Sequence, residues 1–235
     1  MILAVLLLAL QEESTLQKID REVTSIVEKV RPSVVQVTAV FSVGGPQEVA
    51  SLTLSGVVWS RDGHIVTDAS GIESAAEIRV AVGSKTFKAI PVASDLRTGV
   101  AVIKIEADGL SPAAVPEKPG KAGAVAIVVG NPFGMKGGAS TGTVSGYGRS
   151  IQVAGRRYEN MVQLTAPVNP GDCGGFVADS SGRLLGLSVE PEPAVTGAAA
   201  TSPDWAMLLR RAGISESDLV PAEATRPSGA AYTSS

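Results

Sequence analysis

The sequence predicts an all-β protein made of two antiparallel barrels packed side by side. Short Val/Ile/Leu-rich segments, separated by Gly, Pro, Asp and Ser, fall into two groups of about six, at about 33–106 and 122–201. A polar stretch with three prolines, 107–121, lies between the groups and is typical of an extended connector. The composition, 44% hydrophobic and 18% charged residues, is that of a chain able to bury two such cores.

The first element, residues 1–13, begins with the apolar run MILAVLLLAL. Such a run is too short for a bilayer core, which needs roughly 20 residues, but it suits the apolar region of a secretory signal. We therefore expect export to the periplasm or the cell exterior. A short buried strand, or a start codon placed too far downstream, would be the alternative explanations.

A helix is predicted from Ser14 to Val30, because Ser14 and Gln17 fit a capping box and Pro32 ends the pattern. Its apolar residues recur at three- and four-residue steps: Leu16, Ile19, Val23, Ile26, Val27 and Val30.

The strands of the first barrel are expected at 33–41, 55–60, 64–67, 77–82, 87–93 and 100–105. Those of the second are expected at 124–129, 140–148, 161–168, 174–179, 183–190 and 196–201. A short closing helix is expected at 203–212 and a disordered tail at 216–235, so that the folded domain spans 14–215.

Charge and residue counts exclude several classes of function. Twenty Lys and Arg against 23 Asp and Glu give a net charge of -3, which does not favour binding to nucleic acid. The chain has one Cys, Cys173, and one His, His64, so internal disulfides are impossible and a Cys/His metal cluster is nearly so. We expect no metal and no cofactor. Any catalysis by imidazole within one chain must use His64.

The most informative motif is the run NPGDCGG at 169–175. Its glycines allow a sharp turn in which successive backbone N–H groups point at one place, as an oxyanion hole requires. Gly171, Asp172 and Cys173 are the candidate donors of this hole. An ordinary tight turn around a small buried thiol would give the same pattern.

The chain from about 27 to 207 resembles the protease domain of the HtrA/Deg family of trypsin-like serine endopeptidases. The matching stretches keep family order and spacing: EKVRPSVVQV (28–37), SGVVWSRDGHIVT (55–67), SDLRTGVAVIKI (94–105), VVGNPFG (128–134), STGTVSGYGR (140–149) and VQLTAPVNPGDCGG (162–175). The resemblance implies two six-stranded barrels with a peptide cleft between them. It also implies oligomers and often a PDZ domain, for which the residues after Met207 are too few.

All three catalytic residues of the family are replaced in this chain. The resemblance places Ser70 where the family has its histidine, Gly99 where it has its aspartate, and Cys173 where it has its serine. We call these the base, acid and nucleophile positions. Without a base, no side chain at these positions can return a proton to the leaving amine of a peptide bond.

His64 does not replace the missing base in our interpretation. It lies six residues before Ser70 on a predicted strand, a distance of roughly 20 Å in an extended chain. Asp68, Asp95 and Asp172 are nearby in the sequence, but we interpret them as turn residues.

The sequence therefore favours an inactive relative of these peptidases, a pseudoprotease that binds extended or unfolded peptide segments. Leu187, Ser188 and Val189 are the candidate edge for pairing with such a peptide. An active endopeptidase or esterase, using Cys173 with an unidentified base, is the alternative. A structural remnant without a ligand is a third possibility.

Overall fold

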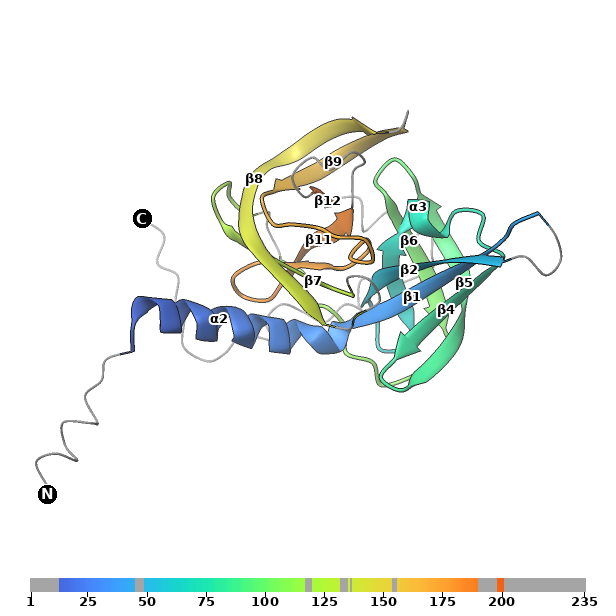
Figure 1. Ribbon diagram of the computed structural model, residues 1–235, viewed down its shortest axis with the longest axis horizontal. Coiled ribbons are helices and arrows are strands. Elements are labelled where there is room, and N and C mark those ends of the chain that lie inside the picture. The colour runs from blue at the N-terminus through green and yellow to red at the C-terminus, as the bar shows by residue number, and fades with distance from the viewer. Residues whose placement is uncertain are drawn as a thin grey trace, which may run out of the picture.

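The first group of predicted strands closes into a six-stranded barrel in the computed structural model (Figure 1). The structure describes residues 13–44, 49–116, 120–131, 135, 137–153, 156–189 and 198–200. The strands of this barrel are β1 Val34–Ser42, β2 Val49–Val58, β3 His64–Asp68, β4 Glu77–Val82, β5 Lys85–Asp95 and β6 Val100–Ile105. They pair in the order β1-β2-β3-β6-β5-β4, and every pair is antiparallel.

The second group forms another closed barrel with the order β10-β11-β12-β9-β8-β7, again antiparallel throughout. Its strands are β7 Val125–Gly130, β8 Gly138–Val153, β9 Arg156–Leu164, β10 Phe176–Ala178, β11 Leu184–Val189 and β12 Ala198–Ala200. The fold class predicted from the sequence is confirmed. The N-terminal segment, the closing helix expected at 203–212 and the tail lie outside the described residues.

The helix α2, Thr15–Val30, confirms the helix predicted before the barrels. Ser14 caps it and forms the expected capping box with Gln17, and a short 3-10 turn, Arg31–Ser33, follows at Pro32. The helix runs beneath the second barrel in Figure 1, and it buries Val27 and Val30. Among the described residues, no helix is long and apolar enough to cross a membrane.

Three apolar cores hold the molecule together, because each barrel fills its own interior and a third core joins the two. Val37 and Ile65 lie inside the first barrel, and Val128 and Leu164 lie inside the second. Between the barrels, residues of both meet α2 in one cluster that includes Val57, Val66, Val100, Val129, Phe176 and Leu187. The shared core fixes the two barrels against each other, so segments from both can build one site.

Candidate functional site

The turn at 169–175 lies between β9 and β10 and has the sharp bend that its glycines predict. The Asp172 N–H donates to the Asn169 carbonyl at 2.9 Å, and the Gly175 N–H donates to the Asp172 carbonyl at 2.8 Å. Gly171 and Gly174 have φ angles of +95° and +81°, a backbone conformation that residues with a Cβ rarely adopt. The turn therefore needs glycine on both sides of the Asp172–Cys173 pair.

The Asp172 side chain supports the turn from inside. Its Oδ2 accepts the Asn169 N–H at 3.0 Å, and the residue is only 4% exposed. Burial raises its pKa above the ordinary value, and the bonds from Asn169 only partly oppose that shift. The prediction that Asp172 is a turn residue agrees with these contacts.

The expected set of oxyanion donors is changed by this arrangement. The Asp172 amide is taken by the Asn169 carbonyl, so it is not available to a ligand. The Gly171 amide has no acceptor among the described residues, and it remains a candidate donor. Asp172 is excluded as a donor because its N–H, in the middle of the turn, makes the hydrogen bond to Asn169 that tightens the turn.

The first barrel holds the Cys173 turn through Ser55 of β2. The Ser55 N–H donates to the Cys173 carbonyl at 2.8 Å, and Ser55 Oγ donates to the Gly171 carbonyl at 2.8 Å. The same Oγ accepts the Asn131 N–H at 2.9 Å. Ser55 is fully buried, so one side chain joins β2, the turn and the end of β7.

Gly174 brings the turn against the end of β3. A Cβ built on Gly174 would lie 2.3 Å from the Ser55 carbonyl oxygen, 2.7 Å from Thr67 Oγ1 and 2.8 Å from the Asp68 backbone nitrogen. Only glycine permits this approach. Cys173 therefore lies where β3 ends and the base position begins, and its side chain packs against the core of the first barrel.

The base position is occupied by a serine that is bonded to a buried carboxyl. Ser70 lies in a single helical turn, α3 (Ala69–Ile72), which directly follows β3. Its Oγ donates to Asp68 Oδ2 at 2.6 Å, and the Gly71 N–H donates to the same oxygen at 2.8 Å. Asp68 is thus the N-cap of α3 and holds the Ser70 hydroxyl.

Asp68 has an environment that disfavours its charged form. The residue is 3% exposed, and Oδ1 has no hydrogen-bond partner among the described residues. Burial raises the pKa of this carboxyl above its ordinary value, against the opposing effects of the Ser70 and Gly71 bonds and the charge of Arg156. The capping bond agrees with the sequence-based interpretation of Asp68 as a turn residue, whereas its burial and the unpartnered Oδ1 have no signal in the sequence.

The acid position contains no acid and little room for one. Gly99 has a φ of +76°, and its carbonyl accepts the Ala69 N–H at 3.0 Å. A Cβ built on it would lie 3.3 Å from Cε1 of Tyr158 and 3.8 Å from Cγ2 of Val189. Tyr158 of β9 is buried in the core between the barrels. The backbone of Gly99, packed under the Tyr158 ring, therefore supports α3 in place of a carboxylate.

Polar contacts across the barrel boundary surround these two positions. Arg97 Nη1 donates to Glu159 Oε2 at 3.0 Å, and the Glu159 N–H donates to the Arg97 carbonyl at 2.9 Å. Arg156 Nη2 donates to Glu73 Oε2 at 2.6 Å. The start of β9 is therefore bonded to the segments on either side of the base and acid positions, and this region is closed by contacts within the protein.

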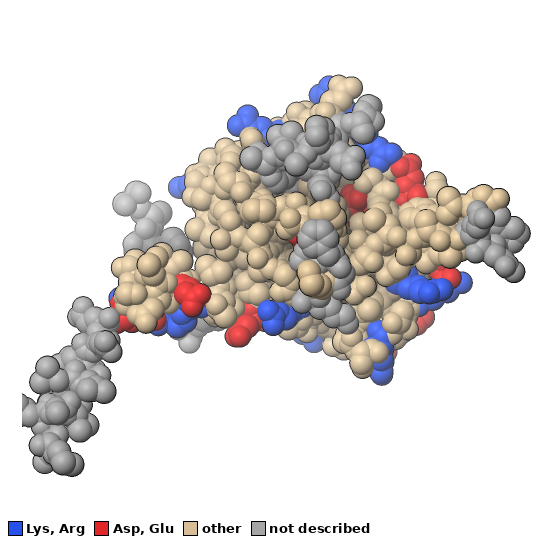
Figure 2. All heavy atoms as spheres, in the orientation of Figure 1, with Lys and Arg blue, Asp and Glu red and all other residues tan. Residues whose placement is uncertain are grey.

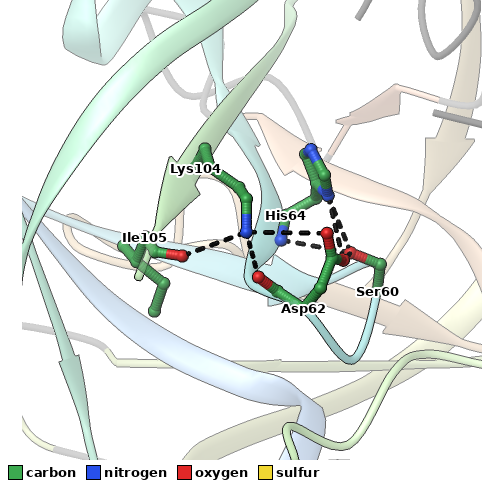
Figure 3. Close-up of polar contacts among 5 residues, drawn as sticks. All are labelled: Ser60, Asp62, His64, Lys104 and Ile105. Carbon is green, nitrogen blue, oxygen red and sulfur yellow. Dashed lines mark hydrogen bonds and ion pairs between the residues drawn. The ribbon is translucent and has the colours of Figure 1, made fainter. Parts of the chain in front are cut away.

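His64 belongs to a different site, at the opposite end of β3 (Figure 3). Its Nδ1 lies 2.9 Å from Ser60 Oγ and 3.1 Å from Asp62 Oδ1, and Lys104 Nζ lies 3.5 Å from Asp62 Oδ2. Hydrogen bonds from Ser60 and His64, with the charge of Lys104, lower the pKa of Asp62 to about 2. Ser, His and Asp thus meet, but both partners use the same ring nitrogen, so no proton can pass through the ring between them.

The position of His64 bears on the interpretation made from the sequence. His64 and Asp68 are the two ends of β3, paired with Lys104 and Val100 of β6. Four residues of strand separate them by about 13 Å, too far for His64 to serve Cys173 as a base. The described residues also contain no group of three or more His, Cys, Asp or Glu placed to hold a metal ion.

The candidate peptide edge, Leu187–Val189, is already paired. Ser188 donates its N–H to the Gly175 carbonyl at 3.0 Å and accepts the Gly174 N–H at 2.7 Å. On its other side, β11 pairs with β12, Leu187 opposite Ala200 and Val189 opposite Ala198. A peptide could pair with these three residues only by displacing β12.

Residues 54–187 match the model of the trypsin-like peptidase domain. The chain belongs to this family. It is 38% identical over 147 residues to "Protease Do-like 1, chloroplastic" of Arabidopsis thaliana, which covers 60% of this chain and 34% of that protein. The chain thus spans about a third of the length of that relative. Relatives of Chlamydia trachomatis and Halomonas elongata, each 32% identical, bear the name "Probable periplasmic serine endoprotease DegP-like".

Solved structures of related proteases have the same fold. The active form of the Rv3671c protease of M. tuberculosis aligns with a TM-score of 0.71 and 26% identity, over 81% of this chain and 85% of that chain. The HtrA-type protease AlgW, with a serine replaced by alanine and a tripeptide present, aligns with a TM-score of 0.70 and 25% identity, over 83% and 64%. The HtrA/Deg resemblance stated from the motifs is confirmed.

Two residues of this trypsin-like site were missed by reasoning from the sequence. Tyr158 lies in a β9 segment with no catalytic motif, and nothing in the sequence points from it to Gly99. Ser55 could have been found, because it opens the family-like stretch SGVVWSRDGHIVT, but its role depends on a turn more than a hundred residues away.

Proposed function

We propose that this chain is an inactive member of the trypsin-like peptidases, which retains the barrels and binds extended or unfolded peptide segments. The observation that carries the proposal is the base position: Ser70 stands there and gives its hydroxyl proton to a bond with Asp68. A serine hydroxyl has no useful pKa for general acid-base catalysis near neutrality. The leaving amine of a peptide bond would therefore receive no proton.

The acid position supports the same conclusion. A catalytic carboxylate orients the imidazole and stabilises its charged form, and Gly99 offers only a backbone carbonyl that Ala69 already occupies. Members of a catalytic triad act as a unit, so the loss of the base alone removes several orders of magnitude in rate. An ordinary cysteine thiol has a reference pKa of about 8.5, so that without a base to take its proton only a few per cent is thiolate at pH 7.

Binding of peptides is supported by what the family retains around such a site. The solved AlgW structure holds a tripeptide on a related fold. In this chain the Gly171 amide still lacks an acceptor among the described residues, beside the Cys173 turn. Such an N–H can donate to the carbonyl oxygen of a bound peptide. Export, assembly into oligomers and the absence of a cofactor belong to the same proposal.

An active enzyme using Cys173 is the second candidate, and one observation favours it. Asp68 lies at the end of β3, where its backbone nitrogen approaches Gly174 of the Cys173 turn, and its Oδ1 lacks a partner among the described residues. A carboxylate whose pKa is raised by burial is a stronger base than an ordinary carboxylate. This candidate requires Asp68, or Asp68 through Ser70, to take the thiol proton.

A turnover assay on an unfolded protein substrate separates the two candidates. We expect no cleavage by the full chain above the rate of the Cys173→Ala variant. Turnover that disappears in both Cys173→Ala and Asp68→Asn, in proteins that remain folded by circular dichroism, would refute the inactive assignment and support the second candidate. Binding of a labelled unfolded substrate, measured by fluorescence anisotropy, then tests the cleft. No saturable binding would leave a structural remnant.

A further inference from the structure

A cavity of about 390 Å³ lies where α2 ends and the first barrel begins. Three segments form its wall: the end of α2 with the 3-10 turn that follows, the start of β1, and the turn between β4 and β5 (Figure 1). The lining residues are Glu28, Arg31, Pro32, Val34, Val35, Val82 and Gly83. None of them belongs to the base, acid and nucleophile positions or to the 169–175 turn. The volume is within the range of about 300–1,000 Å³ that is usual for small-molecule sites.

The apolar part of this lining is held by the cores of the molecule. Val34 packs against the core between the barrels, and Val82 packs against the core of the first barrel, in which Val35 is 3% exposed. A Cβ built on Gly83 would meet no atom within 4 Å, so the β4–β5 turn borders open space. An aliphatic side chain of a ligand would therefore find a preformed apolar wall and room beside it.

Two opposite charges also line the cavity, those of Glu28 and Arg31. Both side chains are exposed, and neither has a hydrogen-bond or ion-pair partner among the described residues. Arg31 is the C-cap of α2 and keeps helical backbone angles, so the two residues are neighbours at i and i+3. At this spacing their Cβ atoms lie about 5–6 Å apart. The carboxylate and the guanidinium are thus close enough for one small ligand to reach both.

The guanidinium of Arg31 is held from the side of the second barrel. A Cβ built on Gly137, just before β8, would lie 3.2 Å from Nε and 3.7 Å from Nη2 of Arg31. The guanidinium therefore lies against the backbone of this glycine. The helix end itself is fixed, because Val30 is buried and Lys29 donates to the Ser181 carbonyl at 2.7 Å. A guanidinium positioned in this way is suited to bind a carboxylate through two hydrogen bonds.

The charges of this region favour a ligand that carries both signs. Figure 2 shows acidic and basic side chains interleaved along α2, with no gathering of one sign there. A ligand of many like charges is therefore not favoured, whereas an ammonium group complements Glu28 and a carboxylate complements Arg31. Two extended residues span about 7 Å, which matches the spacing of the two side chains better than a single amino acid does.

We propose that this cavity binds a free dipeptide of apolar residues, with its ammonium group at Glu28, its carboxylate at Arg31 and its side chains against the valines. The proposal does not rest on the binding of unfolded segments described above, because the cavity shares no residue with that site. It assigns the end of α2 a small-molecule site of its own.

The test measures binding of the dipeptide Val-Val to the full chain by isothermal titration calorimetry. We expect saturable binding, which Arg31→Gln and Glu28→Gln each weaken about tenfold, as the loss of one charge-assisted hydrogen bond would. Lys18→Gln and Asp20→Asn, at exposed positions nearer the start of α2, are the matched controls and should leave the affinity unchanged. Circular dichroism verifies that each variant is folded.

Modified probes assign each end of the ligand to one residue. N-acetyl-Val-Val lacks the ammonium group and Val-Val-amide lacks the carboxylate, and each should bind the unmodified chain about tenfold more weakly than Val-Val. Acetylation should cause no further loss in Glu28→Gln, and amidation should cause none in Arg31→Gln. Gly-Gly has both charges without the apolar side chains, and it should also bind at least about tenfold more weakly.

Four results would overturn the proposal. The first is the absence of saturable binding of Val-Val, a result that leaves the binding of unfolded segments untouched. The second is binding that neither Glu28→Gln nor Arg31→Gln weakens, because the ligand would then lie elsewhere. The third is equal affinity for Val-Val and its acetylated and amidated forms. The fourth is free valine binding as tightly as Val-Val, which would exclude a site built for two residues.

Discussion

Replacement of Gly99 by alanine should destabilise the protein more than its backbone angle alone explains. A residue with a side chain pays about 1–2 kcal/mol to adopt a left-handed conformation such as the φ of +76° found here. The new Cβ would also lie 3.3 Å from Cε1 and 3.4 Å from Cδ1 of Tyr158, a ring that is 8% exposed. Overpacking of this kind costs about 1–3 kcal/mol. We expect the free energy of unfolding to fall by about 2–5 kcal/mol.

Gly109 provides the matched control, because its φ is +70° and a Cβ there would meet no atom within 4 Å. Gly109→Ala should therefore lose only about 1–2 kcal/mol. Urea unfolding of both variants, followed by far-ultraviolet circular dichroism, measures the difference between them. Equal losses in the two variants would refute the view that Tyr158 occupies the acid position.

This comparison also bears on attempts to restore activity. The triple variant Ser70→His, Gly99→Asp and Cys173→Ser places a side chain at position 99, where the positive φ and the Tyr158 ring oppose it. The double variant Ser70→His and Cys173→Ser keeps Gly99 and avoids this strain. We expect the triple variant to unfold at a lower urea concentration than the double variant. Its peptidase rate is meaningful only at urea-free conditions where circular dichroism shows both to be folded.

Three further predictions concern buried and paired polar groups. The pKa of Asp68 is raised in the folded state, so the unmodified chain should lose stability as the pH rises above the pKa that this carboxyl has in the unfolded chain. Asp68→Asn lacks this titration and should therefore gain stability relative to the unmodified chain between pH 4 and pH 8. Urea unfolding of both proteins at several pH values measures the difference. Asp62→Asn should lower the free energy of unfolding by about 0.5–1 kcal/mol at pH 7, a small loss because the Asp62 side chain is largely exposed. The loss should vanish as the pH falls toward 2, where the carboxyl of the unmodified chain takes up its proton. Acid unfolding of both proteins checks this. Ser55→Ala should cost about 2–3 kcal/mol, because a buried hydroxyl that serves Asn131 and Gly171 is lost, and a loss below 1 kcal/mol would contradict its bridging role.

The fold could be predicted well because its signals are local. Strand segments are rich in β-branched residues, the capping box of Ser14 and Gln17 marks the helix start, and the prolines of 107–121 mark the crossing between barrels. Each of these features depends on residues within a few positions of one another. The closing of each set of six strands into a barrel follows from the need to pair every edge.

The site could be predicted only as far as its motifs extend. The turn with Cys173 and the replaced base and acid positions are visible in the sequence, because the family-like runs surround them. The contact of Tyr158 with Gly99, the burial of Asp68 and the pairing of Leu187–Val189 with β12 depend on how distant strands meet. The conformation of Gly99 is likewise a property of the folded chain, since glycine adopts both signs of φ readily.

The bridge made by Ser55 has a consequence for the order of folding. The Cys173 and Gly171 carbonyls of the second half of the chain are held by one residue of the first half. Neither barrel alone can therefore give the turn its final shape, which forms when the two halves dock. The rate at which an alkylating reagent loses access to Cys173 during refolding thus reports the docking of the barrels, while circular dichroism reports the formation of their strands.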